Sequence, residues 1–188
     1  VHLVIDRYLQ REETVTVRTW PSARDGRFSC REFELWDQRG EAVARATSSW
    51  AVLDLISRRP VKLDRLPAYP LTTRRAVADD FATLPRLTEA VAEEEFKVRR
   101  YDLDLNRHAN NVAYVSWALE SVPPAFTTAF RPAALEIGYR AEAFAGDLVM
   151  ARLGTPGQGP EPEIIHQLIR SDGTELTRLR SRWRPVGG

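Results

Sequence analysis

Apolar and polar residues alternate with a period of two along much of the chain, which is the pattern of β-strands with one buried face. The strands that this pattern predicts cover residues 2–8, 13–20, 28–36, 41–55, 94–106, 133–143, 147–154, 163–170 and 175–185. The range 41–55 is ambiguous by composition, but its valine, threonine, serine and tryptophan residues follow the turn "DQRG" directly and favour a strand. The chain is therefore predicted to consist mainly of antiparallel sheet.

One segment, residues 110–122, leaves this alternation and has the spacing of a helix. The apolar residues that would share one face of the helix are Val112, Val115, Leu119 and Val122. Asn110 or Asn111 can cap its start, and the two prolines from residue 123 onward end it. The strands and this helix together predict an α+β fold.

An internal repeat links the two ends of the chain. The segments "GEAVARATSSW" (40–50) and "GTELTRLRSRW" (173–183) match at one constant offset, and each follows a strand and a polar turn. The matching pairs are Gly40 and Gly173, Arg45 and Arg178, Ser48 and Ser181, and Trp50 and Trp183. The repeat predicts two copies of one α+β unit. The helix of the first copy is expected before Val1, because the chain begins without methionine and already in strand-like sequence.

Residues 58–95 hold four prolines and few periodic runs, which is typical of a long connection between two units. We therefore predict a first repeat over 1–60 without its first strand and helix, a linker over 61–92, and a second repeat over 93–188 that carries the candidate site.

Composition excludes few functions. The formal net charge is +1, and no basic tail or block of lysine and arginine invites nucleic acid. Neither a membrane-spanning run nor a signal peptide is recognised in the sequence, so a cytoplasmic protein without membrane partners is expected. A single cysteine, Cys30, cannot form an internal disulfide, and its alternating neighbours predict a packed thiol rather than a nucleophile.

The stretch "YDLDLNRHANN" (101–111) places polar residues at every second position, directly before the predicted helix. These residues are Asp102, Asp104, Asn106 and His108. Any one of them is more commonly a helix cap or a satisfied side chain, but extended spacing would point all four to one side. Burying four polar groups together is costly without a purpose. The helix start at Asn110 and Asn111 adds unpaired N–H groups and a positive dipole end, which suit an oxyanion.

A metal site is a poor alternative for the same stretch. Its first three acidic or amide residues match a calcium loop, but Arg107 and Ala113 stand where that loop needs glycine and glutamate. Zinc would need a second histidine or cysteine near His108, and the sequence has none there. We predict no metal and no cofactor.

The segment "VRRYDLDLNRHANNVAYVSWALESVP" (98–123) resembles the signature of the acyl-acyl-carrier-protein thioesterases, the plant FatA/FatB type and their bacterial relatives. The repeated ending in arginine and tryptophan and the early "VTVRTW" also fit that family, so the resemblance covers nearly the whole chain. It implies a double hot-dog fold, in which two antiparallel sheets each wrap a central helix. The first repeat would be truncated at its N-terminus.

The resemblance also implies the catalytic residues. The family's Asp-x-Asn-x-His run falls on Asp104, Asn106 and His108, and its later glutamate, within Tyr-Arg-x-Glu, falls on Glu142. Ala143 stands where the plant pattern has a cysteine, so no cysteine acyl-enzyme can form there and the chemistry would use water. The implied reaction is hydrolysis of fatty acyl-acyl-carrier-protein. Either His108 or Glu142 can be the general base, with the other as its orienting partner.

The implied partner is an acidic acyl carrier protein bearing the acyl chain on phosphopantetheine. Arginines near the motif would dock it: Arg99, Arg100, Arg107, Arg131 and Arg140. A homodimer is compatible with this interpretation. One alternative is an acyl-CoA thioesterase, which performs the same chemistry on a soluble carrier. A hot-dog hydratase is a second alternative, but hydratases carry motifs that differ from the Asp-x-Asn-x-His run. A non-catalytic acyl-ligand sensor is a third, and such a regulator would usually carry a DNA-binding segment.

Overall fold

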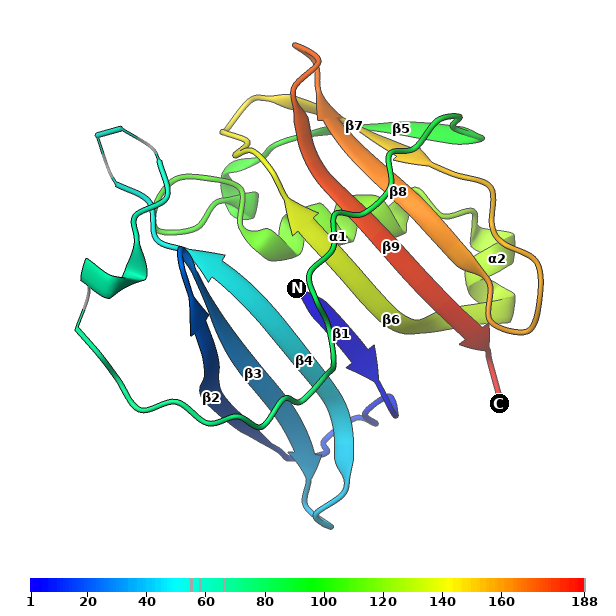
Figure 1. The fold of residues 1–188 in the computed structure, drawn as a ribbon. Coiled ribbons are helices and arrows are strands. Elements are labelled where there is room, and N and C mark those ends of the chain that lie inside the picture. The colour runs from blue at the N-terminus through cyan, green and yellow to red at the C-terminus, as the bar shows by residue number, and fades with distance from the viewer. Residues whose placement is uncertain (55, 58, 66, 188) are drawn as a thin grey trace. The chain divides into compact units, whose positions relative to one another are not determined.

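The computed structural model describes residues 1–54, 56–57, 59–65 and 67–187 (Figure 1). The chain divides into two compact units, Val1–Ala82 and Thr83–Gly188. This boundary lies within the segment 61–92 that the sequence predicts as a linker.

The first unit is built on an antiparallel sheet with the strand order β2-β3-β4-β1. Its elements are β1 (His2–Ile5), β2 (Val15–Asp25), β3 (Phe28–Asp37), β4 (Ala42–Ala51) and the 3₁₀ turn η1 (Leu63–Arg65). The strand predicted over 2–8 is shorter than expected, because Arg7 turns away to bind Glu13 and Asp37. Among its described residues this unit has no α-helix.

Residues 72–79 are bound to the sheet of the first unit. The indole N–H of Trp20 donates to the carbonyl of Arg74 at 2.9 Å, and the Arg74 guanidinium lies 4.4 Å from the centre of the Trp20 ring. The N–H of Ala76 donates to the buried carboxylate of Glu32 at 2.9 Å. This segment therefore supplies hydrogen-bond partners to a polar face of the sheet.

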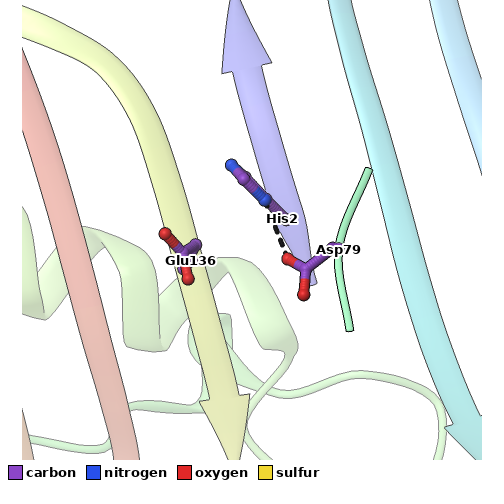
Figure 2. A group of neighbouring side chains, drawn as sticks. All are labelled: His2, Asp79 and Glu136. Carbon is purple, nitrogen blue, oxygen red and sulfur yellow. Dashed lines mark hydrogen bonds and ion pairs between the residues drawn. The ribbon is translucent and has the colours of Figure 1, made fainter. Parts of the chain in front are cut away.

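His2 and Asp79 fasten the end of that segment to β1. The Nδ1 atom of His2 lies 2.8 Å from Oδ2 of Asp79, as Figure 2 shows. Glu136, which is also drawn in Figure 2, belongs to the second unit and accepts hydrogen bonds there from Arg180, at 2.6 Å from Nη2 and 3.0 Å from Nε. Both carboxylates thus have cationic or imidazole partners within their own units.

The second unit is an antiparallel sheet with the strand order β6-β9-β8-β7-β5. Its strands are β5 (Ala92–Lys97), β6 (Phe130–Tyr139), β7 (Leu148–Leu153), β8 (Glu163–Arg170) and β9 (Glu175–Pro185). Its helical elements are the 3₁₀ turn η2 (Arg100–Asp102) and the helices α1 (Asn111–Glu120) and α2 (Pro124–Ala129). Helix α1 packs against β7, β8 and β9 (Figure 1).

Helix α1 forms where the sequence predicts it, but it buries a different face. The buried residues are Ala113, Tyr114, Trp117 and Ala118, whereas Val112 is 68% exposed. The predicted face is therefore wrong for Val112, whereas Val122, just after the helix, is 3% exposed and has Leu119 packed against its cluster, as predicted. The aromatic rings of Tyr114 and Trp117 bury more apolar area than two valines would, and alanines between them allow close contact with the sheet.

Helix α2 was not predicted. The prolines end α1 as expected, but Pro124 then occupies the first turn of α2, a position where its missing N–H costs nothing. Three strands also end earlier than predicted. The strand over 41–55 stops at Ala51, and its predicted last residue, 55, lies outside the described residues. The strand over 94–106 stops at Lys97, and the strand over 133–143 stops at Tyr139, where the N–H groups of Arg140 and Ala141 both donate to the carbonyl of Leu176.

The internal repeat is confirmed by matching geometry within each unit. Turn glycines at 40 and 173 have φ of 81° and 85°. Glu34 pairs with Arg45 across β3 and β4, and Gln167 pairs with Arg178 at the equivalent place across β8 and β9. In both copies the tryptophan indole donates to the serine two residues before it, at 2.6 Å for Trp50 and 2.7 Å for Trp183.

A buried polar chain runs through the core of the second unit. The side chain of His166 is 1% exposed, and its Nε2 lies 2.7 Å from the hydroxyl of Ser181, which also accepts the indole N–H of Trp183. Burial lowers the pKa of His166 from 6.5 to about 4.

This burial predicts that the second unit loses stability in mild acid. In the unfolded chain His166 binds a proton near pH 6.5, whereas in the folded protein it stays neutral down to about pH 4. The free energy of unfolding therefore keeps its full contribution from the neutral His166 above pH 6.5 and decreases as the pH falls below 6.5. The loss at pH 4 should be roughly 3 kcal/mol. Urea unfolding of wild type and His166→Gln at about pH 7 and about pH 4 measures this loss of stability. An equal pH dependence in both proteins would contradict the prediction.

Candidate active site

The segment between β5 and α1 is a tight turn rather than an extended strand. The N–H of Asp104 donates to the carbonyl of His108 at 2.9 Å, and the N–H of Arg107 donates to the carbonyl of Asp104 at 3.0 Å. Arg107 takes a left-handed φ of 64° within this turn. The predicted extended row of polar side chains over 102–108 is therefore wrong, because the chain reverses there.

The Asp104 side chain holds this turn together. Its Oδ1 accepts the N–H of Asn106 at 2.8 Å and the N–H of His108 at 3.4 Å. Aspartate suits such a position because its short side chain reaches the backbone two residues on. Asp104 and Asn106 are exposed, so the expectation that four polar groups would be buried together is also wrong. Asp104 instead binds backbone N–H groups of its own turn.

His108 and Glu142 are distant in sequence and meet in the second unit. The Nδ1 atom of His108 lies 3.4 Å from Oε1 of Glu142, and the two side chains are 27% and 39% exposed. The ring of Phe144 packs edge-on against the imidazole with centroids 5.2 Å apart. A carboxylate beside one imidazole nitrogen can orient the ring and leave the second nitrogen for proton transfer, and solvent reaches both groups.

A short backbone bridge brings these two residues together. The N–H of Ala109 donates to the carbonyl of Ala143 at 2.8 Å, and His108 lies opposite Phe144 in an antiparallel bridge. Ala109 directly follows His108, and Ala143 directly follows Glu142. The hydrogen bond between Ala109 and Ala143 therefore limits the distance between the side chains of His108 and Glu142. Phe144 was not identified from the sequence, and its place two residues after Glu142 was the available signal.

The start of α1 offers one open N–H group. Asn110 caps the helix, as predicted, because its Oδ1 accepts the N–H of Val112 at 2.7 Å. The N–H of Asn110 itself donates to the carbonyl of Asp102 at 2.7 Å and is not available to a substrate. In the described part of the chain, the N–H of Asn111 has no acceptor. The hydroxyl of Tyr139 donates to the carbonyl of Asn111 at 3.1 Å.

Burial raises the pKa of Tyr139 to about 12. The hydroxyl therefore keeps its proton at neutral pH and remains a hydrogen-bond donor to the helix start. Tyr139 is the tyrosine of the Tyr-Arg-x-Glu segment, so the sequence indicated the residue but not this contact.

The five arginines suggested for docking do not form one cluster. Arg99, Arg100 and Arg107 are exposed on the loop that leads to His108. Arg131 and Arg140 lie at opposite ends of β6, about 30 Å apart for nine residues of strand. Arg140 also lies 3.3 Å from the carboxylate of Glu175. The three loop arginines are therefore the ones placed beside the candidate site.

Other reactive groups give no competing centre. Cys30 lies on β3, and burial raises the pKa of its thiol, which disfavours the nucleophilic thiolate. Within either unit taken alone, the described residues bring no three histidine, cysteine or carboxylate side chains within reach of one ion. No helix in the described ranges combines the length and apolar character needed to cross a membrane.

Two family models match the chain. The acyl-ACP thioesterase C-terminal domain matches residues 86–185, and the acyl-ACP thioesterase N-terminal domain matches residues 1–65. The chain belongs to the acyl-ACP thioesterase family. The resemblance seen in the sequence is thereby confirmed, and the matched C-terminal domain contains His108 and Glu142.

Plant members of the family are similar over the whole of this chain. A chloroplastic palmitoyl-acyl carrier protein thioesterase of Gossypium hirsutum is 31% identical over 202 residues, which cover 98% of this chain and 49% of the relative. One of Cuphea hookeriana with the same name is 29% identical and covers 100% of this chain and 48% of its own. The chain thus spans about half the length of these curated relatives.

Solved structures of the family have the same fold. The 12:0-ACP thioesterase from Umbellularia californica superposes with a TM-score of 0.84 at 26% identity, covering 98% of this chain and 73% of that one. An acyl-ACP thioesterase from Bacteroides thetaiotaomicron gives a TM-score of 0.79 at 20% identity, covering 97% and 74%. The predicted α+β fold of hot-dog type is confirmed. The placement of a first helix before Val1 stays a prediction.

Proposed function

We propose that this chain hydrolyses the thioester of fatty acyl-acyl-carrier-protein and releases a free fatty acid in fatty acid synthesis. The observation that carries the proposal is the 3.4 Å approach of His108 to Glu142 in a member of the acyl-ACP thioesterase family. The open N–H of Asn111 supports it, because acyl transfer needs a donor for the oxyanion. The names of the plant relatives support the class of substrate.

In the proposed reaction, Glu142 orients the imidazole of His108 through Nδ1. The Nε2 atom then takes a proton from a water molecule as the water oxygen attacks the thioester carbon. The N–H of Asn111 and the positive end of α1 stabilise the negative oxygen. When the carbon–sulfur bond breaks, His108 returns the proton to the phosphopantetheine thiolate. The reaction consumes one water and one thioester and yields a carboxylic acid and a thiol, so it needs no other reactant.

Asn106 and Asp104 would support the reaction from the turn. Asp104 fixes the backbone of His108 through Oδ1, and the exposed amide of Asn106 would position the water or the carbonyl. The opposite division, with Glu142 as base and His108 as its partner, uses the same geometry. The variants described in the Discussion separate the two.

Two other functions share this site geometry. An acyl-CoA thioesterase would perform the same chemistry on a soluble carrier, and an acyl-ligand binder would hold the thioester without turnover. We place the carrier protein first because Arg99, Arg100 and Arg107 are exposed on the loop that leads to His108. A local positive patch of this kind steers an acidic protein toward the site.

The test measures thiol release from matched long-chain acyl-carrier-protein and acyl-CoA. We expect turnover on the carrier substrate. Replacing Arg99, Arg100 and Arg107 together with glutamate should raise KM for acyl-carrier-protein about tenfold or more and leave kcat/KM for acyl-CoA little changed. An equal loss on both substrates would favour the acyl-CoA enzyme, and tight acyl binding without turnover would favour the binder.

A further inference from the structure

The backbone that carries Glu142 is held from the side of helix α1 by Tyr114. The N–H of Ala143 donates to the hydroxyl oxygen of Tyr114 at 2.9 Å. Tyr114 is 3% exposed and Ala143 is fully buried, so this hydrogen bond lies away from solvent. Burial raises the pKa of Tyr114, and the hydroxyl therefore stays neutral and keeps its oxygen lone pairs for the amide.

Arg170, at the end of β8, holds the same segment from another side. Its Nη1 donates to the carbonyl of Glu142 at 3.2 Å and lies 3.6 Å from Oδ2 of Asp147. That same Asp147 oxygen accepts the N–H of Phe144 at 2.9 Å. The guanidinium thus connects both ends of the turn that follows Glu142.

These contacts fix several consecutive backbone groups. The carbonyl of Glu142 is bound by Arg170, the N–H of Ala143 by Tyr114, and the carbonyl of Ala143 by Ala109. The side-chain torsions of Glu142 and His108 then set the distance between the carboxylate and the imidazole. Removing the Tyr114 hydroxyl would leave a buried N–H without an acceptor, and such a group draws the backbone toward another partner.

We propose that Tyr114 and Arg170 are positioning residues that hold Glu142 at its working distance from the His108 imidazole. The proposal rests on the proposed function, because it assigns these residues to the same reaction. Neither residue is assigned a contact with substrate. Their effect passes through the backbone of residues 142–144, where a displacement of about 1 Å can cost up to 10²-fold in rate.

The experiment compares wild type, Tyr114→Phe and Arg170→Lys in steady-state hydrolysis of acyl-carrier-protein. We expect kcat to fall about 10-fold to 10²-fold in both variants while KM changes less than about twofold. The matched control is Ser121→Ala, which removes a buried hydroxyl bound to the carbonyl of Ala118 on the same helix. This control tests whether loss of any buried hydrogen bond of α1 has the same effect.

A second readout does not depend on activity. The chain has three histidines, so the ring signals of His108 can be assigned in NMR spectra by comparison with His108→Ala. We expect Tyr114→Phe and Arg170→Lys to move the His108 signals in the direction that Glu142→Gln moves them, whereas Ser121→Ala leaves them in place. Arg170→Lys keeps the positive charge at this position. If Tyr114→Phe does not fold, Arg170→Lys still tests whether the backbone contacts set the position of Glu142.

The outcomes separate this proposal from the proposed function. Wild-type turnover with unchanged kcat in both variants would overturn the positioning role and leave the function intact. Absence of wild-type turnover on either thioester would overturn the function. In that case unmoved His108 signals would overturn the positioning role as well, and moved signals would support it.

Discussion

Replacing His108 with alanine is expected to lower kcat for acyl-carrier-protein hydrolysis by about 10²–10⁴-fold. In the proposed reaction the imidazole either takes the proton of the attacking water or holds the carboxylate that does, since its Nδ1 lies 3.4 Å from Glu142. KM should change little, since the proposed carrier contacts are made by other residues, Arg99, Arg100 and Arg107. Single-turnover thiol release, with folding checked by circular dichroism, measures the effect.

Glu142 variants decide which residue is the base. If Glu142 only orients His108, Glu142→Gln should lose less than His108→Ala, because its amide oxygen can still accept a hydrogen bond from Nδ1. If Glu142 is the base, Glu142→Gln should lose as much as His108→Ala, because an amide cannot accept the proton. The double variant should be little worse than the stronger single variant, since the two residues act as one unit.

Ser116→Ala is a suitable control for these variants. Its hydroxyl bonds only the carbonyl of Val112 on the exposed side of α1, so near-normal kcat is expected. Near-normal turnover in both His108→Ala and Glu142→Ala, in folded protein, would refute the proposed site.

Glu32→Ala should destabilise the first unit by about 3–5 kcal/mol. The Glu32 carboxylate is fully buried and accepts hydrogen bonds from Ser22 at 2.5 Å and Thr47 at 2.8 Å, with Nε of Arg75 at 3.0 Å. It also binds the N–H of Ala76. Alanine would leave these donors without their shared acceptor and a partly buried arginine without its counter-ion.

Urea unfolding measures the loss, and hydrogen exchange of the amides over 72–79 shows where it acts. Those amides should exchange much faster in Glu32→Ala, because the segment is fastened to the sheet through this carboxylate. Glu12→Ala is the matched control. Its carboxylate is 84% exposed and 3.5 Å from Arg11, and removing such a surface pair should cost less than about 1 kcal/mol. Equal losses in the two variants would contradict the role of burial.

The site shows why sequence reasoning reached its residues but not their geometry. Alternation at 102–108 suggested an extended row of polar groups, yet Asp104 bends the chain by accepting backbone N–H groups two and four residues ahead. Local side-chain hydrogen bonds of this kind compete with extended structure. The spacing along the chain therefore identified the right segment and gave the wrong shape.

The buried face of α1 illustrates the same limit. Both possible faces carry apolar residues, so period alone could not choose between the valine face and the face of Tyr114 and Trp117. Contacts with β7, β8 and β9 made the choice. Burying Tyr114 also placed its hydroxyl on the N–H of Ala143, a contact that no local pattern could predict.

By itself the sequence determined the positions of most strands, the cap and end of α1, the internal repeat and the family. Each of these depends on neighbours in the chain or on a fixed offset between two segments. Tertiary structure alone decided that His108 meets Glu142 and that the N–H of Asn110 donates to the carbonyl of Asp102. It also decided that Tyr114 and Arg170 hold the backbone of residues 142–144. Apart from the contact of Asn110 with Asp102, which lies within one loop, those contacts join segments tens of residues apart, and their geometry is set by packing of the sheet on the helix rather than by local preference.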